Sequence, residues 1–454
     1  MKTNKLLPRL WLCAFLGLAS LSSAQTIVSG PNISGTWGPC SGCNPYIIAG
    51  DCNVPAGQKL TVQPGVVVWI GAGVSITVYG EIQAVGTPTQ RIIVQAPTGS
   101  QYWNSLFLYP YDYSKTNRLK YCDFQNASTA VSISDPFAGA MATEIMNCTF
   151  SNCISQGIYV AVGGNVQQFL QVRNCDFASM SNGCVINLVG TVNCCGGYAN
   201  ATILANKFRN LAGAALLLTA EIGGASPALF LNNTIVSSQQ GVIAQDPWDT
   251  RVQDNIFVGC TNAVTAIGSL SRNVSYNDFY GNATNFTGYS GNYGNWIIPN
   301  RNGTLSDIFS NIGENPLFLA TNDFHLATNS PCVDAGTPDW VYSDMCFPPS
   351  QGTGYPDLGA YGGPDACNWL DVVPELPVTA SASQANGIGT LSWDAVPRST
   401  YRLQYCTNLV SAGTNIWLDF VDVLATDKPT SFVGALDQPK AFIRIQSLGR
   451  TPGN

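Results

Sequence analysis

Charged residues are scarce in this sequence. They make up 10% of the 454 residues, and a single histidine, His325, is present. Long helices need Glu, Lys and Arg on their solvent faces, so this shortage excludes a mainly helical fold. A formal net charge of −7 leaves no excess of Lys and Arg, which excludes nucleic acid as a partner. Cys40 and Cys43 have a metal-like spacing but no second close pair, so we predict no metal site there.

Long apolar runs are absent after the N-terminus. Residues 1–24 combine a basic head, an apolar run from Leu10 to Leu21 and a small-residue exit, which is typical of a secretory signal peptide cleaved after Ala24. The apolar run is too short to remain as a membrane-spanning helix. We therefore expect an exported protein without a transmembrane anchor, located in the periplasm, on the cell surface or in the medium.

Cysteines, in contrast, are numerous. Sixteen are present, and fifteen remain once Cys13 is removed with the signal peptide. Export permits disulfides, but an odd number leaves at least one thiol unpaired within the chain. Six of the cysteines gather near the two ends of the main domain, where a cross-link would stabilise loops, and their pairing stays open: Cys40, Cys43, Cys52, Cys332, Cys346 and Cys367.

An internal repeat occupies the middle of the chain. An aromatic or Ile position recurs at intervals of 26, 27, 31, 27, 22 and 22 residues. Units this short, rich in Gly, Asn, Thr, Ser and Val, hold strands and tight turns rather than helices. One unit cannot bury its own apolar face, so stacked copies must share a continuous core, which predicts a solenoid. The marked positions are Phe124, Phe150, Phe177, Phe208, Ile235, Phe257 and Phe279.

A second column should lie beside these inward aromatic residues. Because side chains alternate along a strand, the residue two positions before each marked residue also points inward. An Asn there can satisfy its amide on the next turn of the coil, and a Cys is most simply a small buried hydrophobe. A redox or metal-binding thiol stack is the less favoured interpretation, and disulfides between neighbouring turns depend on geometry. The column comprises Cys122, Cys148, Cys175, Asn206, Asn233, Asn255 and Asn277.

Two sets of motifs resemble a known group of proteins. Residues 54–68 read VPAGQKLTVQPGVVV, and the later motifs are NPLF (315–318), DFHL (323–326), SPCVDAG (330–336) and DLGAY (357–361). They resemble the opening and closing segments of right-handed parallel β-helix repeat proteins that bacteria export, which have a pectate-lyase-like architecture. The resemblance covers roughly residues 30–366. It implies an all-β chain with a right-handed parallel β-helix over residues 25–370, but no particular activity.

The edges of the coil and a second domain can also be placed. We expect the coil to start near Ile47, to carry about seven marked turns to Phe279 and to close at Tyr361. Residues 371–378 are punctuated by proline and indicate a linker. Residues 379–454 contain short alternating runs that predict a small β-sandwich. They resemble a fibronectin type III-like module, whose role would be that of a spacer or attachment module.

Familiar catalytic motifs are missing. Polysaccharide lyases on this fold need a basic residue for proton abstraction, with calcium or Arg to offset the charge of a uronate. Polygalacturonases on this fold use paired Asp residues and a Gly-His-Gly segment, whereas this chain has no adjacent Asp pair and its histidine lies in a closing motif. No phosphate loop, Gly-x-Ser-x-Gly elbow or nucleotide fingerprint is found. We therefore lean against catalysis.

The best remaining polar cluster lies late in the coil. Asp246 and Asp249 are candidate calcium ligands, Trp248 is a candidate platform for a sugar ring, and Arg251 is a candidate partner for a carboxylate. Lys207 and Arg209, two turns earlier, are candidates to join them. The alternative, which we favour, is an ordinary polar turn with one anchoring Trp.

A second candidate is an aromatic group. Aromatic faces line sugar-binding grooves, but the same side chains could close the base of the coil, and we favour packing, most of all for Trp103. The group comprises Tyr102, Trp103, Tyr109, Tyr111 and Tyr113.

Two classes of function remain. The first is a secreted or surface protein that binds glycan or extracellular matrix along one long face without catalysis, and we favour it. The second is a carbohydrate-active enzyme, a lyase or a glycoside hydrolase, acting on an acidic polysaccharide. No cofactor other than calcium is expected. The ligand and the oligomeric state stay open.

Overall fold

The fold is known from a computed structural model of residues 1–454. It describes a large central part of the chain and the strands of a C-terminal unit. The described residues are 25–28, 30–40, 44–97, 101–109, 115–135, 140–163, 167–189, 198–220, 228–245, 250–267, 273–289, 291–369, 380–385, 388–393, 399–406, 418–424, 430–435 and 442–450.

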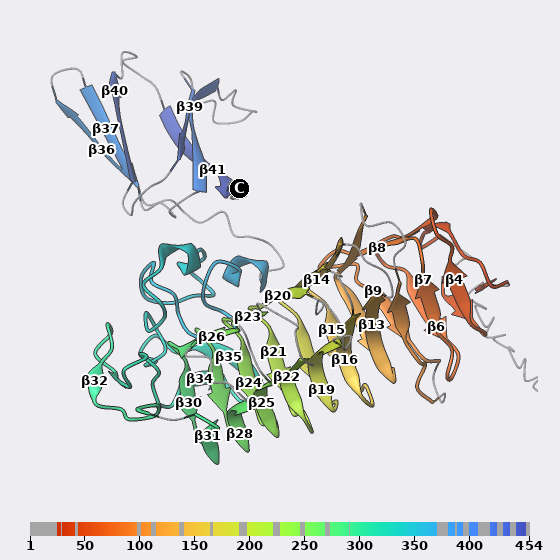
Figure 1. Ribbon diagram of the computed structural model, residues 1–454. Coiled ribbons are helices and arrows are strands. Elements are labelled where there is room, and N and C mark those ends of the chain that lie inside the picture. Colours follow the sequence, from red (N-terminus) through yellow and green to blue (C-terminus); the bar gives the residue numbers. More distant parts are fainter. Residues whose placement is uncertain are drawn as a thin grey trace, which may run out of the picture.

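Most of the chain forms a right-handed parallel β-helix whose strands stack into three long sheets (Figure 1). Every neighbouring pair in these sheets is parallel, and each turn of the coil passes from sheet 1 to sheet 2 to sheet 3. Sheet 1 contains β1 (Thr26–Val28), β3 (Tyr46–Ile48), β6 (Val67–Ile70), β9 (Ile92–Gln95), β12 (Cys122–Gln125), β15 (Thr149–Ser151), β18 (Asp176–Ala178), β21 (Lys207–Arg209), β24 (Thr234–Val236), β27 (Ile256–Val258) and β30 (Asp278–Tyr280).

Sheets 2 and 3 complete each turn. Sheet 2 contains β4 (Cys52–Val54), β7 (Ile76–Val78), β10 (Leu106–Leu108), β13 (Thr129–Asp135), β16 (Gln156–Gly163), β19 (Asn182–Val189), β22 (Ala214–Ala220), β25 (Gln240–Gln245), β28 (Asn262–Ile267) and β31 (Thr284–Thr287). Sheet 3 contains β2 (Gly35–Trp37), β5 (Lys59–Val62), β8 (Glu81–Val85), β11 (Thr116–Lys120), β14 (Ala140–Met146), β17 (Gln167–Arg173), β20 (Tyr198–Leu204), β23 (Ala228–Leu231), β26 (Arg251–Gln253) and β29 (Val274–Ser275).

The repeating aromatic residues form the core that the sequence predicts. Phe124, Phe150, Phe177 and Phe208 are buried and stack face to face, with ring centroids 5.2, 4.7 and 4.7 Å apart. Each ring sits one turn above the last, because β12, β15, β18 and β21 pair in register at these positions. The solenoid interior is therefore a continuous stack rather than a set of separate small cores.

The inward column of Cys and Asn is also confirmed. The side-chain Oδ1 of Asn233 accepts hydrogen bonds from the backbone N–H and the side-chain amide of Asn206, and Asn255 does the same for Asn233. The thiols do more than fill space, as Cys148 donates to the carbonyl oxygens of Met146 and Leu119. No disulfide joins Cys122, Cys148 and Cys175, which are free and buried.

Seven successive corners from sheet 3 to sheet 1, from that between β11 and β12 to that between β29 and β30, each contain one non-glycine residue in the left-handed conformation. Among non-glycine residues, Asn tolerates this conformation best, which suits the Asn residues at three of these corners. The corner side chains point away from the core and are free to meet other parts of the chain. These corner residues, with φ between 48° and 58°, are Tyr121, Asn147, Asn174, Ala205, Asn232, Asp254 and Tyr276.

The coil starts earlier than predicted. β1 pairs in parallel with β3, matching Thr26 with Tyr46, and β2 pairs with β5, so one more turn precedes Ile47. The prediction of a start near Ile47 was wrong: the aromatic markers begin only at Phe124, so they do not locate the first turn, which is built on the short strand Thr26–Val28. The marked turns do run to Phe279 on β30.

After the last turn, the chain runs back along the coil. Residues 312–369, which we call the strap, follow the short pair β32 (Ile298–Pro299) and β33 (Leu305–Ser306). The strap contains β34 (Phe318–Ala320), β35 (Asp323–Leu326) and the short 3-10 helices η1 (Trp340–Tyr342) and η2 (Ala366–Trp369). A disulfide joins Cys346 and Cys367 within the strap, while Cys332 and Cys52 are free. A cross-link near this end of the domain agrees with the sequence analysis.

The strap is fastened to successive corners of the coil in reverse order. The backbone N–H of Thr337 donates to Asp254, and the Asn232 amide donates to the carbonyl of Asp357. Farther along, the Asn174 amide donates to the carbonyl of Asp365 at 2.9 Å, and the Asn147 amide to that of Asn368 at 2.6 Å. Figure 1 shows this blue-green segment lying over the green turns. The strap therefore covers the corner between sheets 3 and 1.

The C-terminal unit is built from antiparallel strands. One sheet contains β36 (Ala380–Ala385), β37 (Ile388–Trp393) and β40 (Thr430–Ala435), and the other contains β38 (Ser399–Cys406), β39 (Leu418–Leu424) and β41 (Phe442–Arg450). Trp393 and Leu391 from the first sheet share a small core with Tyr401 and Leu403 from the second. This arrangement agrees with a small sandwich. The predicted linker 371–378 lies outside the described residues, and the likeness to fibronectin type III stays a prediction.

Candidate functional site

The residues singled out in the sequence do not form one group. Lys207 and Arg209 project outward from β21 of sheet 1, whereas Arg251 is an exposed residue at the start of β26 in sheet 3. The remaining candidates, Asp246, Trp248 and Asp249, lie outside the described residues.

The aromatic candidates divide in a similar way. Trp103 is fully buried and donates its Nε1–H to the carbonyl of Gln125, which confirms its packing role. Tyr102 and Tyr109 are half-buried, while Tyr111 and Tyr113 lie outside the described residues.

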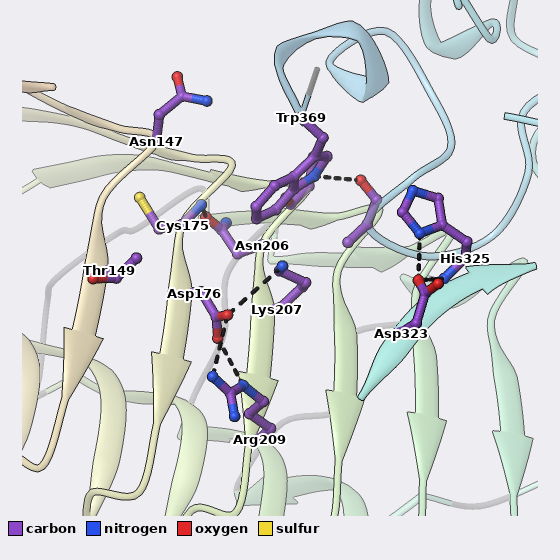
Figure 2. Close-up of polar contacts among 12 residues, drawn as sticks. Asn147, Thr149, Cys175, Asp176, Asn206, Lys207, Arg209, Asp323, His325 and Trp369 are labelled. Carbon is purple, nitrogen blue, oxygen red and sulfur yellow. Dashed lines mark hydrogen bonds and ion pairs between the residues drawn. The ribbon is translucent and has the colours of Figure 1, made fainter. Parts of the chain in front are cut away.

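Lys207 and Arg209 share one carboxylate partner on the neighbouring turn. Asp176 of β18 pairs in register with Lys207, and its Oδ2 lies 3.6 Å from Lys207 Nζ. Its Oδ1 accepts from Arg209 Nε at 3.0 Å and its Oδ2 from Arg209 Nη2 at 3.4 Å, so the guanidinium binds in a two-point fork. Figure 2 shows the two cations on either side of this carboxylate. The result is a compact ion group on the outer face of sheet 1.

The strap adds aromatic residues to this group. Trp369 lies with its ring centroid 4.1 Å from Lys207 Nζ, and its Nε1–H donates to the carbonyls of Ala205 and Ala360. Tyr361 lies 5.7 Å from the same ammonium and stacks on His325 with centroids 3.7 Å apart. These rings form a wall at one end of the exposed part of sheet 1, built entirely from residues that sequence reasoning did not connect with Lys207.

A carboxylate orients the single histidine in this wall. The side chain of Asp323 bonds to His325 Nδ1 and also accepts from the His325 backbone N–H (Figure 2). Burial would raise the pKa of Asp323, but the hydrogen bonds from His325 outweigh it and hold that pKa below its usual range. With Nδ1 engaged, Nε2 is the ring nitrogen left to bind a ligand.

Burial also changes the acidity of Lys207. Desolvation under the aromatic wall lowers the pKa of its ammonium, and Asp176 partly offsets this effect. A lysine of this kind gives up its proton more readily than a surface lysine, so it has the chemistry of a general base as well as that of a hydrogen-bond donor.

Toward the N-terminus, the outer face of sheet 1 carries more polar side chains. Arg91 donates from Nε to both oxygens of Asp123, at 2.8 and 3.0 Å, and the Thr149 hydroxyl donates to Asp123 at 2.6 Å. Asp123, Thr149, Asp176 and Lys207 occupy matched positions on four successive turns. Asp123, Thr149 and Asp176 bond to other residues of the coil, whereas Lys207 also contacts rings of the strap. The next outward residue, Thr234, is fully buried and bonds to the strap.

A second outward column runs beside the first. Trp69, Gln95, Gln125 and Ser151 are matched in register and half-buried. Apolar residues occupy three positions of these columns, namely Val67, Ile93 and Ala178. We call the other residues of the two columns the outer track, which comprises Trp69, Gln95, Asp123, Gln125, Thr149, Ser151, Asp176, Lys207 and Arg209. With strands about 4.8 Å apart, the six strands from β6 to β21 span roughly 24 Å. The outer track therefore offers a row of donors and acceptors between Trp69 and Trp369, repeated at about the length of one monosaccharide unit.

The part of the chain that the structure describes contains no group of three His, Cys, Asp or Glu residues able to hold a metal ion. Calcium was expected from Asp246 and Asp249, which are not described. In the described ranges, no helix is long and apolar enough to cross a membrane.

Comparison with known proteins supports the fold. Residues 129–305 match the family model for the right-handed β-helix region. Over 57 residues, 13% of this chain, the sequence is 35% identical to Protein bark beetle of Drosophila melanogaster. The match covers 2% of that protein, so the chain spans only a small fraction of its length. These likenesses agree with the parallel solenoid and assign no activity.

Proposed function

We propose that this protein binds a glycan along the outer track without chemically changing it. The observation that carries the proposal is the in-register row of half-buried Asp, Thr, Gln, Ser and Arg side chains that ends at the Trp369 wall. Sugar hydroxyls need such paired donors and acceptors, and the face of a sugar ring packs on an aromatic ring. A polysaccharide or a glycan of an extracellular matrix is long enough to use several turns at once.

Site-directed variants test this proposal. Asp123→Asn and Asp176→Asn keep the shape of the outer track but weaken its acceptors, so each should reduce the affinity for a bound oligosaccharide about tenfold, or about 1.4 kcal/mol. The Glu144→Gln variant is a matched control, because Glu144 forms an equivalent ion pair with Arg118 on the outer face of sheet 3. Calorimetric titration with an oligosaccharide panel provides the measurement. Equal losses in the control and the track variants would refute the assignment to sheet 1.

A second candidate function is supported by the environment of Lys207. Its lowered pKa and the adjacent Arg209 are what a lyase acting on an acidic polysaccharide would use as base and charge-neutralising group. The same panel separates the two functions. Unsaturated products that absorb in the ultraviolet, and that disappear in Lys207→Ala, would favour the enzyme, whereas binding without new products favours the glycan-binding protein.

We also propose that the protein is exported and acts outside the cytoplasm. The signal-like residues 1–24 support this, and the first strand of the coil starts two residues later, at Thr26. Expression in a bacterial host with an active secretory pathway should yield a mature chain that begins at Gln25, as determined by N-terminal sequencing. A chain that keeps residues 1–24 and remains in the cytoplasm would contradict export.

A further inference from the structure

Every cation of the outer track has a carboxylate partner. Arg91 flanks the track and is held by Asp123, with 2.8 Å between Arg91 Nη2 and Asp123 Oδ1. Lys207 and Arg209 share Asp176. Asp323, which bonds to His325, contributes a further negative charge that acts on Lys207. Counted with the flanking Arg91 and with Asp323, the track has three cations (Arg91, Lys207 and Arg209) and three carboxylates (Asp123, Asp176 and Asp323), so its charges balance.

From this balance we infer that the ligand of the outer track is an uncharged polysaccharide, one built from neutral sugars rather than uronates. The inference rests on the proposed function and deepens it, since it names the class of glycan that fits the same surface. The sequence analysis named an acidic polysaccharide as the substrate if the protein were an enzyme. A neutral ligand differs from that expectation.

An acidic glycan would have to compete with the carboxylates of the protein. A uronate could take the Nε–Nη2 edge of Arg209 only by displacing Asp176 from its two-point fork. On the remaining guanidinium N–H groups it would lie beside the Asp176 carboxylate. Two carboxylates side by side repel each other, and the side chain of Asp176 is only 19% exposed, which limits screening by water. The same argument applies to Asp123, whose side chain is 18% exposed and is held by Arg91.

A neutral sugar meets no such obstacle. Asp123 Oδ1 already accepts from Arg91 and from Thr149, but Asp123 Oδ2 and the oxygens of Asp176 can each accept a further hydrogen bond. Both carboxylates can therefore accept hydrogen bonds from sugar hydroxyls while they keep their Arg partners. Gln95, Gln125 and Ser151 in the neighbouring column each provide both a donor and an acceptor. Such a surface recognises hydroxyl groups without requiring a charge.

The direct test compares neutral and acidic oligosaccharides at two salt concentrations. Xylan, mannan and β-glucan fragments represent the neutral class, and polygalacturonate and alginate fragments the acidic class. We expect at least one neutral fragment to bind at least tenfold more tightly than either acidic fragment, with an affinity that barely changes between low and high salt. An affinity dominated by ion pairing would instead fall steeply with salt.

The Asp176→Asn variant tests the ion group formed by Asp176, Lys207 and Arg209. Removing this carboxylate frees Lys207 and Arg209, so the affinity for acidic fragments should rise about tenfold and become salt-dependent, while the affinity for the neutral ligand falls. Glu144→Gln, which frees Arg118 on sheet 3, should change neither affinity.

The outcomes separate the two proposals. Tighter binding of acidic fragments by the unmodified protein, weakened by Asp176→Asn, would overturn the neutral class but leave glycan binding intact. If no fragment binds, or if binding is insensitive to Asp123→Asn and Asp176→Asn, glycan binding at the outer track fails and the inference fails with it.

Discussion

Replacing Asn255 by Ala should lower the free energy of unfolding of the coil by about 3 to 4 kcal/mol, because several buried hydrogen bonds are lost at once. The Asn255 amide donates to the carbonyls of Phe230 and Gln253 and to Asn277 Oδ1, each at 2.9 Å. Its Oδ1 accepts the backbone N–H of Asn233 at 2.8 Å. Alanine leaves that N–H in a dry interior without its partner and removes one donor from each of the two carbonyls, of which that of Gln253 still accepts the Asn232 N–H.

A Cys at the same position should cost less than Ala. In the earlier turns, the Cys148 thiol donates to the carbonyl two residues before it and to one on the previous turn, the same acceptor positions that Asn255 uses. The thiol supplies one weak donor, and its sulfur is only a weak acceptor for the Asn233 N–H, so Asn255→Cys should fall between Ala and the unmodified protein. Urea unfolding followed by circular dichroism measures the order.

Asn262→Ala is the control for this series. Asn262 lies on β28, is only half-buried and accepts a single side-chain bond from Thr287, so its replacement should cost less than about 1 kcal/mol. If Asn255→Ala were no more destabilising than Asn262→Ala, the column of Asn side chains would not contribute to the stability of the coil.

The second large effect is a dependence of stability on pH. The strap covers buried carboxyl groups that have no cationic partner among the described ion pairs. Burial raises the pKa of Asp278 to about 8, and it raises those of Asp254 and Asp357 to about 7. Asp278 accepts from the Glu314 backbone N–H and from the Cys332 thiol, both in the strap. These groups are therefore protonated in the folded protein at a pH where they would be ionised in the unfolded chain.

The sign of the effect follows from linkage. A carboxyl whose pKa is raised by folding stabilises the folded state fully below the unfolded pKa of about 4, and this contribution is lost as the pH rises through 7 to 8. Each pKa unit corresponds to about 1.4 kcal/mol, so raising the pH should lower the free energy of unfolding by several kcal/mol. We expect the melting temperature to be clearly higher at pH 5 than at pH 9.

Asp278→Asn tests which group is responsible. The Asn side chain still accepts the Glu314 N–H but carries no charge, so the variant should be more stable than the unmodified protein at pH 9 and should show a flatter pH profile. Glu144→Gln, at the exposed ion pair on sheet 3, should leave the profile unchanged. A profile of Asp278→Asn parallel to that of the unmodified protein would show that Asp278 does not titrate near pH 8.

The features of the fold that repeat from turn to turn could be predicted from the sequence, whereas those that occur once could not. Alternation along strands placed Phe124 and Cys122 inside, because a period of two is a local property of extended backbone. The aromatic markers begin only at Phe124, so they could not locate the first turn of the coil, at Thr26–Val28. Periodicity also does not predict which outward residues the strap covers. It therefore could not distinguish the buried Thr234 from the half-buried Thr149.

The candidate site was only partly accessible to sequence reasoning. Lys207 and Arg209 stood out as cations in a chain with few charges, and their partner Asp176 lies one turn away, at a spacing that the repeat itself could have indicated. Trp369 and His325 reach the site through the return of the strap, across 162 and 118 residues of sequence from Lys207. No local pattern encodes such a contact.

The strap also changes how the solenoid should unfold. In a simple stack, each turn interacts only with its neighbours, so groups of turns can open independently. Here, bonds from Asn147, Asn174, Asn232 and Asp254 tie four turns to one segment that follows them in sequence. Opening any of these turns requires release from the same strap, which links them into one cooperative unit, while the turns before β12 can open on their own. Hydrogen exchange should therefore divide the coil into two blocks, with the boundary near the point where the strap ends.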